Sequence, residues 1–139
     1  MKFNQRELEV SIIKNIMILD SDIDMNKIVS QRILSSKFNV ISTYNLQEAR
    51  KILCEKNIDM IILDTDLADG SGISLCKELR DKSDISIIFL SKRKREEDVV
   101  NGFKAGADDY FIKPFDKTFT LNVLCQRIDT LFNSIEIRK

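Results

Sequence analysis

The stretch DMIILDTDLADGSG, residues 59–72, decides the fold. Its four apolar residues, Met60 to Leu63, end at a carboxylate, Asp64, which is followed by two further acids and then by small residues. A short apolar run bounded by turn-forming residues is typical of a strand buried on both faces of a parallel sheet. We therefore predict a buried strand over residues 60–63, with acids beyond its carboxyl end.

Runs of the same kind lie on either side of this strand and alternate with helical patterns. The predicted strands are Ile16–Leu19, Val40–Tyr44, Met60–Leu63, Ile85–Leu90 and Tyr110–Ile112. The segments between and after them repeat apolar residues at helical spacing, which predicts five helices. Asn45 and Glu48 are placed to cap the second helix, and Gly106 to end the fourth. This alternation predicts an α/β fold, a doubly wound five-stranded parallel sheet.

Length and composition exclude several classes of protein. The chain has 139 residues, which fits one domain, and its 22 basic and 22 acidic side chains give no general attraction to nucleic acid or membrane. It contains no histidine, which excludes imidazole-based triads and an internal phosphohistidine. Cys54, Cys76 and Cys125 are widely spaced and indicate reduced core thiols. The apolar runs are too short to span a bilayer and no signal peptide is evident, so we expect a cytoplasmic protein.

Polar side chains follow four of the predicted strands where each strand ends. Asp20 follows the first strand, Asp64 the third, Ser91 the fourth and Lys113 the fifth. The carboxyl ends of neighbouring parallel strands share one crevice, so these side chains are expected to meet there. Two carboxylates at such a short separation need a cation between them.

Four segments together resemble the receiver domain of two-component response regulators, the CheY-like family. They are IMILDSD (16–22), IILDTDLADGSG (61–72), IIFLS (87–91) and GADDYFIKPF (106–115). The resemblance implies the flavodoxin-like strand order 2-1-3-4-5 and a signalling domain that is not an enzyme. We expect a receiver domain over 14–133, an N-terminal extension of unknown role over 1–13, and a tail or the start of a linker over 134–139.

The resemblance also implies a role for each residue of the crevice. Asp64 is expected to accept a phosphoryl group from a sensor histidine kinase or a small phosphodonor, with Asp20 in the acidic pair around Mg²⁺. Ser91 is expected to bond a phosphoryl oxygen and Lys113 to pair with the phosphate or Asp64. Tyr110 is expected to act with Ser91 as the aromatic switch. In this family the peptide bond before Pro114 is expected to be cis.

The acidic pair departs from the family pattern, because Ser21 stands where the direct metal ligand is usual. A net loss of about 3 kcal/mol weakens a metal site roughly a hundredfold. Asp66, two residues after the acceptor, is the candidate that compensates, which gives a weak Mg²⁺ site of Asp20, Asp64 and Asp66. Asp22 is a second candidate, although it also fits the cap of the first helix.

Two further departures concern the loops around the crevice. Ala68 replaces the proline that is usual after the acceptor, which we expect to loosen that loop. Lys92 stands where a small residue is usual, and it is expected to shield the site or to pair with Asp66 or with phosphate. Ser21, Asp22 and Lys92 are thus candidate modulators of the site.

The segment GADDY (106–110) and the long last helix are similar to the OmpR/PhoB branch of transcription regulators. Receivers of that branch form homodimers through the fourth helix, fifth strand and fifth helix. The candidate residues of such a face are Asp98, Asp108, Asp109 and Arg127. Binding to DNA would require an output domain outside this sequence.

Two alternatives remain open at this stage. Ser21 and Lys92 are also compatible with a pseudo-receiver that acts as an interaction module without phosphorylation. The motif LDTDLADGSG also resembles the start of haloacid-dehalogenase-type phosphatases, with Asp64 as nucleophile and Asp66 as general acid–base. That motif normally lies on the first strand of its domain and here lies on the third.

Overall fold

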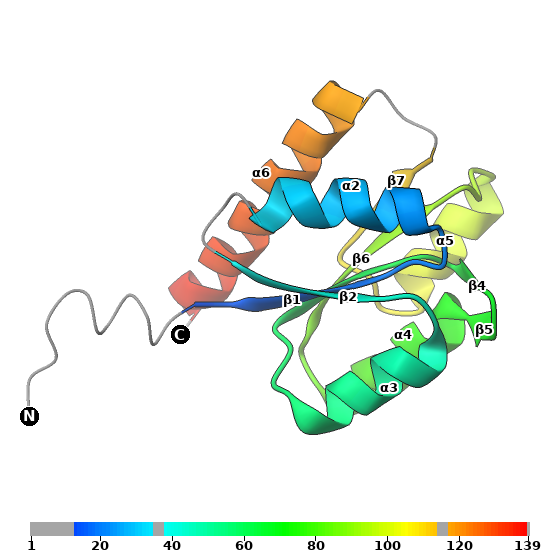
Figure 1. The fold of residues 1–139 in the computed structure, drawn as a ribbon, viewed down its shortest axis with the longest axis horizontal. Helices are drawn as coiled ribbons and strands as arrows, with labels where there is room; N and C mark the ends of the chain where they lie inside the picture. Colours follow the sequence, from blue (N-terminus) through cyan, green and yellow to red (C-terminus); the bar gives the residue numbers. More distant parts are fainter. Residues whose placement is uncertain (1–12, 35–37, 114–116, 139) are drawn as a thin grey trace, which may run out of the picture.

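The apolar runs form five parallel strands of one sheet in the computed structural model, which describes residues 13–34, 38–113 and 117–138 (Figure 1). The strands are β1 (Asn15–Leu19), β2 (Asn39–Thr43), β3 (Met60–Leu63), β6 (Ser86–Ser91) and β7 (Asp109–Ile112). Their order across the sheet is β2-β1-β3-β6-β7. Counted along the chain this is 2-1-3-4-5, which confirms the predicted fold class.

The ends of the strands follow their pairing with neighbours more than their apolar runs. β3 has the predicted bounds, whereas β2 begins and ends one residue earlier because Asn39 to Thr43 pair in register with Asn15 to Leu19. The structure also contains a small antiparallel hairpin, β4 (Asp66–Leu67) and β5 (Gly70–Ser71), which the sequence pattern did not predict. Two-residue strands are too short to show an alternating pattern, so this segment was expected to be a turn.

Five helices occur in the described residues, as predicted. They are α2 (Ile23–Leu34), α3 (Leu46–Glu55), α4 (Gly72–Lys82), α5 (Glu96–Lys104) and α6 (Lys117–Arg138). The Asn45 side chain accepts a hydrogen bond from the Glu48 backbone N–H, and the Glu48 carboxylate accepts one from Tyr44. Gly106 follows the end of α5 with a φ of 111°. Both predicted helix ends are therefore confirmed.

Helices cover both faces of the sheet, with α2 and α6 on one face and α3, α4 and α5 on the other (Figure 1). Successive residues of a strand point to opposite faces, so the fully apolar strands supply both cores. The core under α3, α4 and α5 takes Met17, Leu19, Ile61, Leu63, Ile87 and Phe89 from the sheet. The core under α2 and α6 takes Ile16, Ile18, Met60, Ile62, Ile88 and Leu90.

Some sequence-based expectations fall at or beyond the edges of this structure. Residues 1–12 of the expected N-terminal extension and the peptide bond before Pro114 lie outside the described residues. Helix α6 continues to Arg138, through most of the segment that was expected to be a tail or linker. Across the described segments, no helix combines the length and apolar character needed to cross a bilayer.

Candidate functional site

The carboxyl ends of β1, β3 and β7 bring an acid, a second acid and a lysine together. Leu19 pairs with Leu63 in the sheet, so Asp20 and Asp64 leave adjacent strands at the same level. The Lys113 Nζ lies 2.5 Å from Asp20 Oδ2 and 3.0 Å from Asp64 Oδ2. One ammonium therefore bridges both carboxylates, as the positions of these residues predicted.

The three charges of this cluster differ in their exposure to solvent. The side chains of Lys113 and Asp20 are 2% and 4% exposed, whereas that of Asp64 is 13% exposed. Burial raises the pKa of Asp20, and the hydrogen bond from Lys113 opposes this shift only in part. Burial alone would lower the pKa of Lys113, but the hydrogen bond and charge of Asp20 outweigh it and raise that pKa. Lys113 thus keeps its positive charge, and Asp64 is the carboxylate that an external group can reach.

The hydroxyl of Ser91 is buried beside this cluster and is occupied by two partners. Its Oγ lies 2.5 Å from the Thr65 Oγ1 and accepts a hydrogen bond from the Arg93 backbone N–H at 3.0 Å. Both hydroxyl residues are almost fully buried. Sequence reasoning did not single out Thr65, although a hydroxyl residue directly after the predicted acceptor was the available signal.

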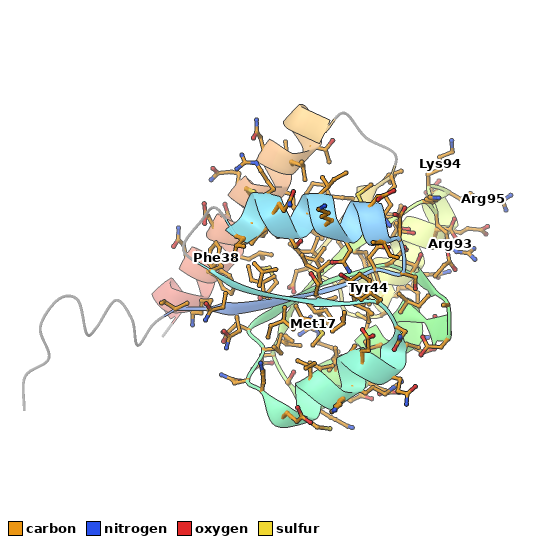
Figure 2. The ribbon with its side chains drawn as sticks, in the orientation of Figure 1. Met17, Phe38, Tyr44, Arg93, Lys94 and Arg95 are labelled. Carbon is orange, nitrogen blue, oxygen red and sulfur yellow. The ribbon has the colours of Figure 1, made fainter. Side chains whose placement is uncertain are left out.

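Tyr110 and Arg93 connect the strand ends to helix α5. The Tyr110 hydroxyl donates a hydrogen bond of 2.6 Å to the Arg93 carbonyl, and its ring packs on Phe89 with centroids 5.8 Å apart. The Arg93 guanidinium contacts the Asp66 carboxylate at 2.7 Å and lies 3.9 Å from that of Asp98. Arg93, Lys94 and Arg95 project from the loop between β6 and α5 at one end of the molecule (Figure 2). Tyr110, Arg93, Asp66 and Asp98 line one cleft of about 550 Å³.

Arg93 takes the role that sequence reasoning gave to Lys92, which was predicted to pair with Asp66 or to shield the site. Lys92 is exposed, and the ion pair with Asp66 is made by its neighbour. The conformation of the loop between β6 and α5 decides which cation reaches Asp66, and no periodicity in KRKR reports that conformation.

The oxygen ligands suited to a magnesium ion are those of Asp20 and Asp64. Mg²⁺ in proteins is commonly held by one or two carboxylates together with water, so this pair fits such an ion. In the described part of the chain no group of three or more acidic, histidine or cysteine side chains is placed to hold a metal. Asp66, the predicted third ligand, faces Arg93 instead. Asp22 accepts a hydrogen bond from the Met25 backbone N–H, as expected for a cap of α2.

The loop between β3 and α4 is fixed at three points. Ala68 N–H donates a hydrogen bond of 3.1 Å to the Ser21 Oγ, and the Asp69 carboxylate accepts hydrogen bonds from the first backbone N–H groups of α3. At Gly72 an added Cβ would lie 2.0 Å from the Asp64 carbonyl oxygen, so only glycine fits there. The expectation that Ala68 loosens this loop did not include its bond to Ser21.

The family model of the response regulator receiver domain matches residues 16–127. The chain belongs to this family. The resemblance carried by the four sequence segments is thereby confirmed, and so is the expectation of a signalling domain that is not an enzyme. The family does not support the phosphatase alternative.

Similar proteins place this receiver near transcription regulators. The chain is 36% identical over 124 residues to the probable transcriptional regulator ycf27 of Cyanidium caldarium, which covers 89% of this chain and 48% of that protein. The chain thus spans about half the length of the curated relatives it matches. Its structure is similar to a two-component response regulator from Clostridium difficile, with a TM-score of 0.81, 25% identity, and coverage of 88% and 98% of the two chains. It is also similar to DrrB, described as a Thermotoga maritima OmpR/PhoB homolog, with a TM-score of 0.76, 26% identity, and coverage of 86% of this chain and 54% of that one.

Proposed function

We propose that this receiver accepts a phosphoryl group on Asp64 from a sensor histidine kinase or a small phosphodonor. The observation that carries the proposal is the bridge from buried Lys113 to Asp20 and to the more exposed Asp64. Because the sequence contains no histidine, the donor has to be a separate molecule. The absence of a nearby base is no obstacle, since an ionised carboxylate is already a nucleophile.

Each residue of the cluster has a part in the proposed transfer. An Asp64 carboxylate oxygen attacks the phosphorus atom, an oxygen–phosphorus bond forms, and the bond from phosphorus to the donor's leaving group breaks. Lys113, held in its charged form, stabilises the oxygens of the transferred group. A magnesium ion held by Asp20 and Asp64 would supply further neutralisation of those oxygens when bound. Ser91 would leave Thr65 to donate a hydrogen bond to the phosphoryl group.

A change at Ser91 has a short covalent and hydrogen-bonded route to helix α5. Ser91 accepts from the Arg93 N–H, and the Arg93 carbonyl accepts from Tyr110. The Tyr110 ring lies against Gly102 in the middle of α5, where an added Cβ would come within 2.9 Å of the ring. Movement of Ser91 would therefore be transmitted to Tyr110 and α5, which is the proposed switch.

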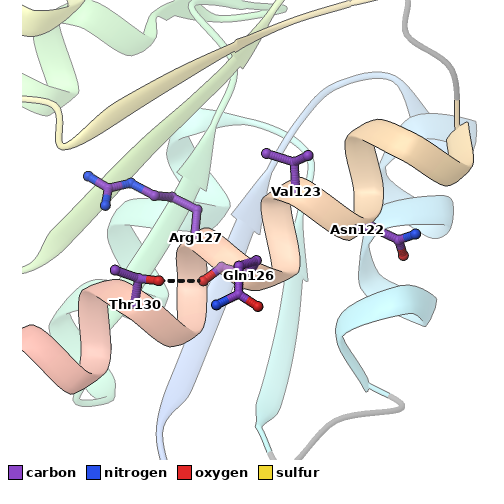
Figure 3. Close-up of a pocket in the computed structure, with 5 residues that line it drawn as sticks. All are labelled: Asn122, Val123, Gln126, Arg127 and Thr130. Atoms are coloured by element: carbon purple, nitrogen blue, oxygen red, sulfur yellow. Dashed lines mark hydrogen bonds between the residues drawn. The ribbon is translucent and has the colours of Figure 1, made fainter.

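The proposed output face consists of α5, β7 and α6, and it exposes an apolar patch. Its exposed apolar residues are Val100, Phe103, Ile112 and Val123. Exposed apolar patches rimmed by polar residues often mark protein interfaces. Next to Val123, a groove of about 360 Å³ runs along α6, lined also by Asn122, Gln126, Arg127 and Thr130 (Figure 3). We propose that phosphorylation changes homodimerisation through this face, or its contact with an output domain, possible control of transcription included.

The charged residues predicted for that face have intramolecular partners in this structure. Asp109 contacts Arg127 at 2.8 Å, and Asp108 accepts a hydrogen bond from the Ile87 N–H and lies 3.4 Å from Arg80. Asp98 accepts a hydrogen bond from the Arg95 N–H. A dimer that uses these residues has to exchange or share these contacts.

The experiment that tests the proposed acceptor is incubation with acetyl phosphate and magnesium, read by intact mass. The wild type is expected to gain the mass of one phosphoryl group, and Asp64→Asn to gain none. A gain that persists in Asp64→Asn would place the acceptor elsewhere. The absence of any adduct in the wild type at all magnesium concentrations would favour the pseudo-receiver, which the engaged hydroxyl of Ser21 also favours.

A further inference from the structure

Two departures from the family pattern, Ser21 and Ala68, are in direct contact. The Ala68 backbone N–H donates to the Ser21 Oγ at 3.1 Å, and the same hydroxyl donates to the Tyr44 carbonyl at 2.8 Å. These bonds join the loop after β1 to the loop after β3 and to the loop after β2. The residues lie 47 positions apart along the chain, so this contact belongs to the fold and not to a local turn.

We infer that Ser21 is a positioning residue that fixes the loop after Asp64 without a metal ion, and that Ala68 is its obligatory partner. A proline at position 68 would have no N–H to donate. An aspartate at position 21 would have no proton for the Tyr44 carbonyl at neutral pH. Serine is short, donates once and accepts at the same oxygen, so it satisfies both neighbours. The two departures thus work as one unit.

The tie has the effect on these loops that a shared metal ligand would have. An acid at position 21 would hold the two loops together only while a cation lay between them, because Asp64 repels it otherwise. The neutral hydroxyl of Ser21 holds them by direct hydrogen bonds, beside a cluster whose two carboxylates already share the Lys113 ammonium. This inference concerns the unphosphorylated loop and is independent of the proposed transfer to Asp64.

Amide hydrogen exchange of the Ala68 N–H, followed by NMR on the full chain, tests the tie directly. We expect exchange in the wild type to be about tenfold slower than in Ser21→Ala, the change that corresponds to loss of one hydrogen bond. This protection is expected to be the same with excess magnesium and with a chelator. Ser21→Thr keeps the hydroxyl and is expected to keep most of the protection.

The matched control is Ser30→Ala on α2. Its hydroxyl bonds only the Lys27 carbonyl of its own helix, so the Ala68 amide is expected to exchange as in the wild type. Equal exchange of Ala68 in the wild type and in Ser21→Ala would overturn the inference. Protection that appears only with magnesium would overturn it as well.

A double-mutant cycle tests whether the two residues act as a unit. In the wild-type background Ala68→Pro removes the hydrogen bond, whereas in the Ser21→Ala background there is no bond left to remove. We therefore expect Ala68→Pro to lower the urea midpoint in the first background and to leave it unchanged or raise it in the second. Equal shifts in both backgrounds would contradict the pairing. The exchange measurement decides independently if a proline variant does not fold.

Discussion

Lys113 is the residue on which the charge balance of the site depends, because its single ammonium contacts both carboxylates. Removing one partner of a buried ion pair leaves an uncompensated charge and typically costs about 3 kcal/mol or more. We predict that Lys113→Ala lowers the free energy of unfolding by about 3 kcal/mol at pH 7, measured by urea denaturation.

The pH dependence of this loss distinguishes charge from packing. Burial raises the pKa of Asp20, so its ionised form opposes folding, and protonation at lower pH relieves that opposition. The deficit of Lys113→Ala is therefore expected to shrink between pH 7 and about pH 5. Lys104→Ala, an exposed lysine of α5, is the control and should change little at either pH. A deficit of the same size at both pH values would indicate lost packing.

Asp66 has the opposite pH dependence. The hydrogen bond from Arg93 holds its pKa below the ordinary value of 3.8, so the pair stabilises the fold above that value and loses its contribution as the pH falls through the lower folded value. Both side chains are more than half exposed, so we predict that Asp66→Asn costs less than about 1 kcal/mol at neutral pH. Thermal denaturation at low and high salt checks this, since screening should reduce the difference. A loss that salt leaves untouched would mean that Asp66 acts through other contacts.

At the residue scale, sequence reasoning found the residues that stand at strand ends. Asp20, Asp64, Ser91 and Lys113 were predictable because an apolar run ends at each and parallel strands bring those ends together. Arg93 and Thr65 were not, because their roles depend on side-chain directions in short loops. The contact between Ser21 and Ala68 was missed for the same reason, although each residue had been noticed separately.

At the element scale, two glycines set how closely helices approach the site. Gly72 begins α4 against the backbone of Asp64, and an added Cβ would lie 2.0 Å from a carbonyl oxygen that cannot move away. Gly102 lies inside α5 against the Tyr110 ring, 2.9 Å from the nearest ring atom, and a ring can rotate. The same substitution is therefore expected to have different effects at the two positions.

We predict that Gly72→Ala lowers the free energy of unfolding by about 3 kcal/mol or more, through forced displacement of the loop after Asp64. Gly102→Ala gains about 1 kcal/mol of helix propensity and loses a similar amount by displacing Tyr110, so its net change is expected to be small. Urea denaturation measures both, and the Tyr110 ring resonances should shift in Gly102→Ala. Similar losses at both positions would show that the ring is as rigid as the backbone.

The helices and strands themselves were largely predictable from periodicity, but their ends were not. β3 matched because both of its boundaries coincide with a change from apolar to polar residues. β2 differed because its pairing with β1 includes Asn39, a polar residue that no pattern assigns to a strand. The hairpin of β4 and β5 depends on backbone pairing alone.

At the scale of the whole molecule, the proposed dimer face can be separated from the phosphorylation site. Phe103 is 47% exposed on α5, so replacing it should have little effect on the fold. Burying it in a dimer would remove apolar area from water, whereas a charge there would have to be desolvated. We predict that Phe103→Glu prevents the dimerisation that acetyl phosphate induces in the wild type, measured by analytical ultracentrifugation.

The matched control is Ile23→Glu, which places the same charge on an apolar residue that is 69% exposed on α2, away from α5, β7 and α6. It is expected to dimerise as the wild type does. Intact mass must show the same phosphoryl adduct in both variants, since neither residue belongs to the cluster around Asp64. If Phe103→Glu dimerises normally, the apolar patch is not the interface, whereas loss of the adduct in that variant would mean that α5 also controls access to Asp64. The second result would extend the route through Arg93 and Tyr110 in the reverse direction, because a bias at α5 must act back on the site with the same coupling free energy.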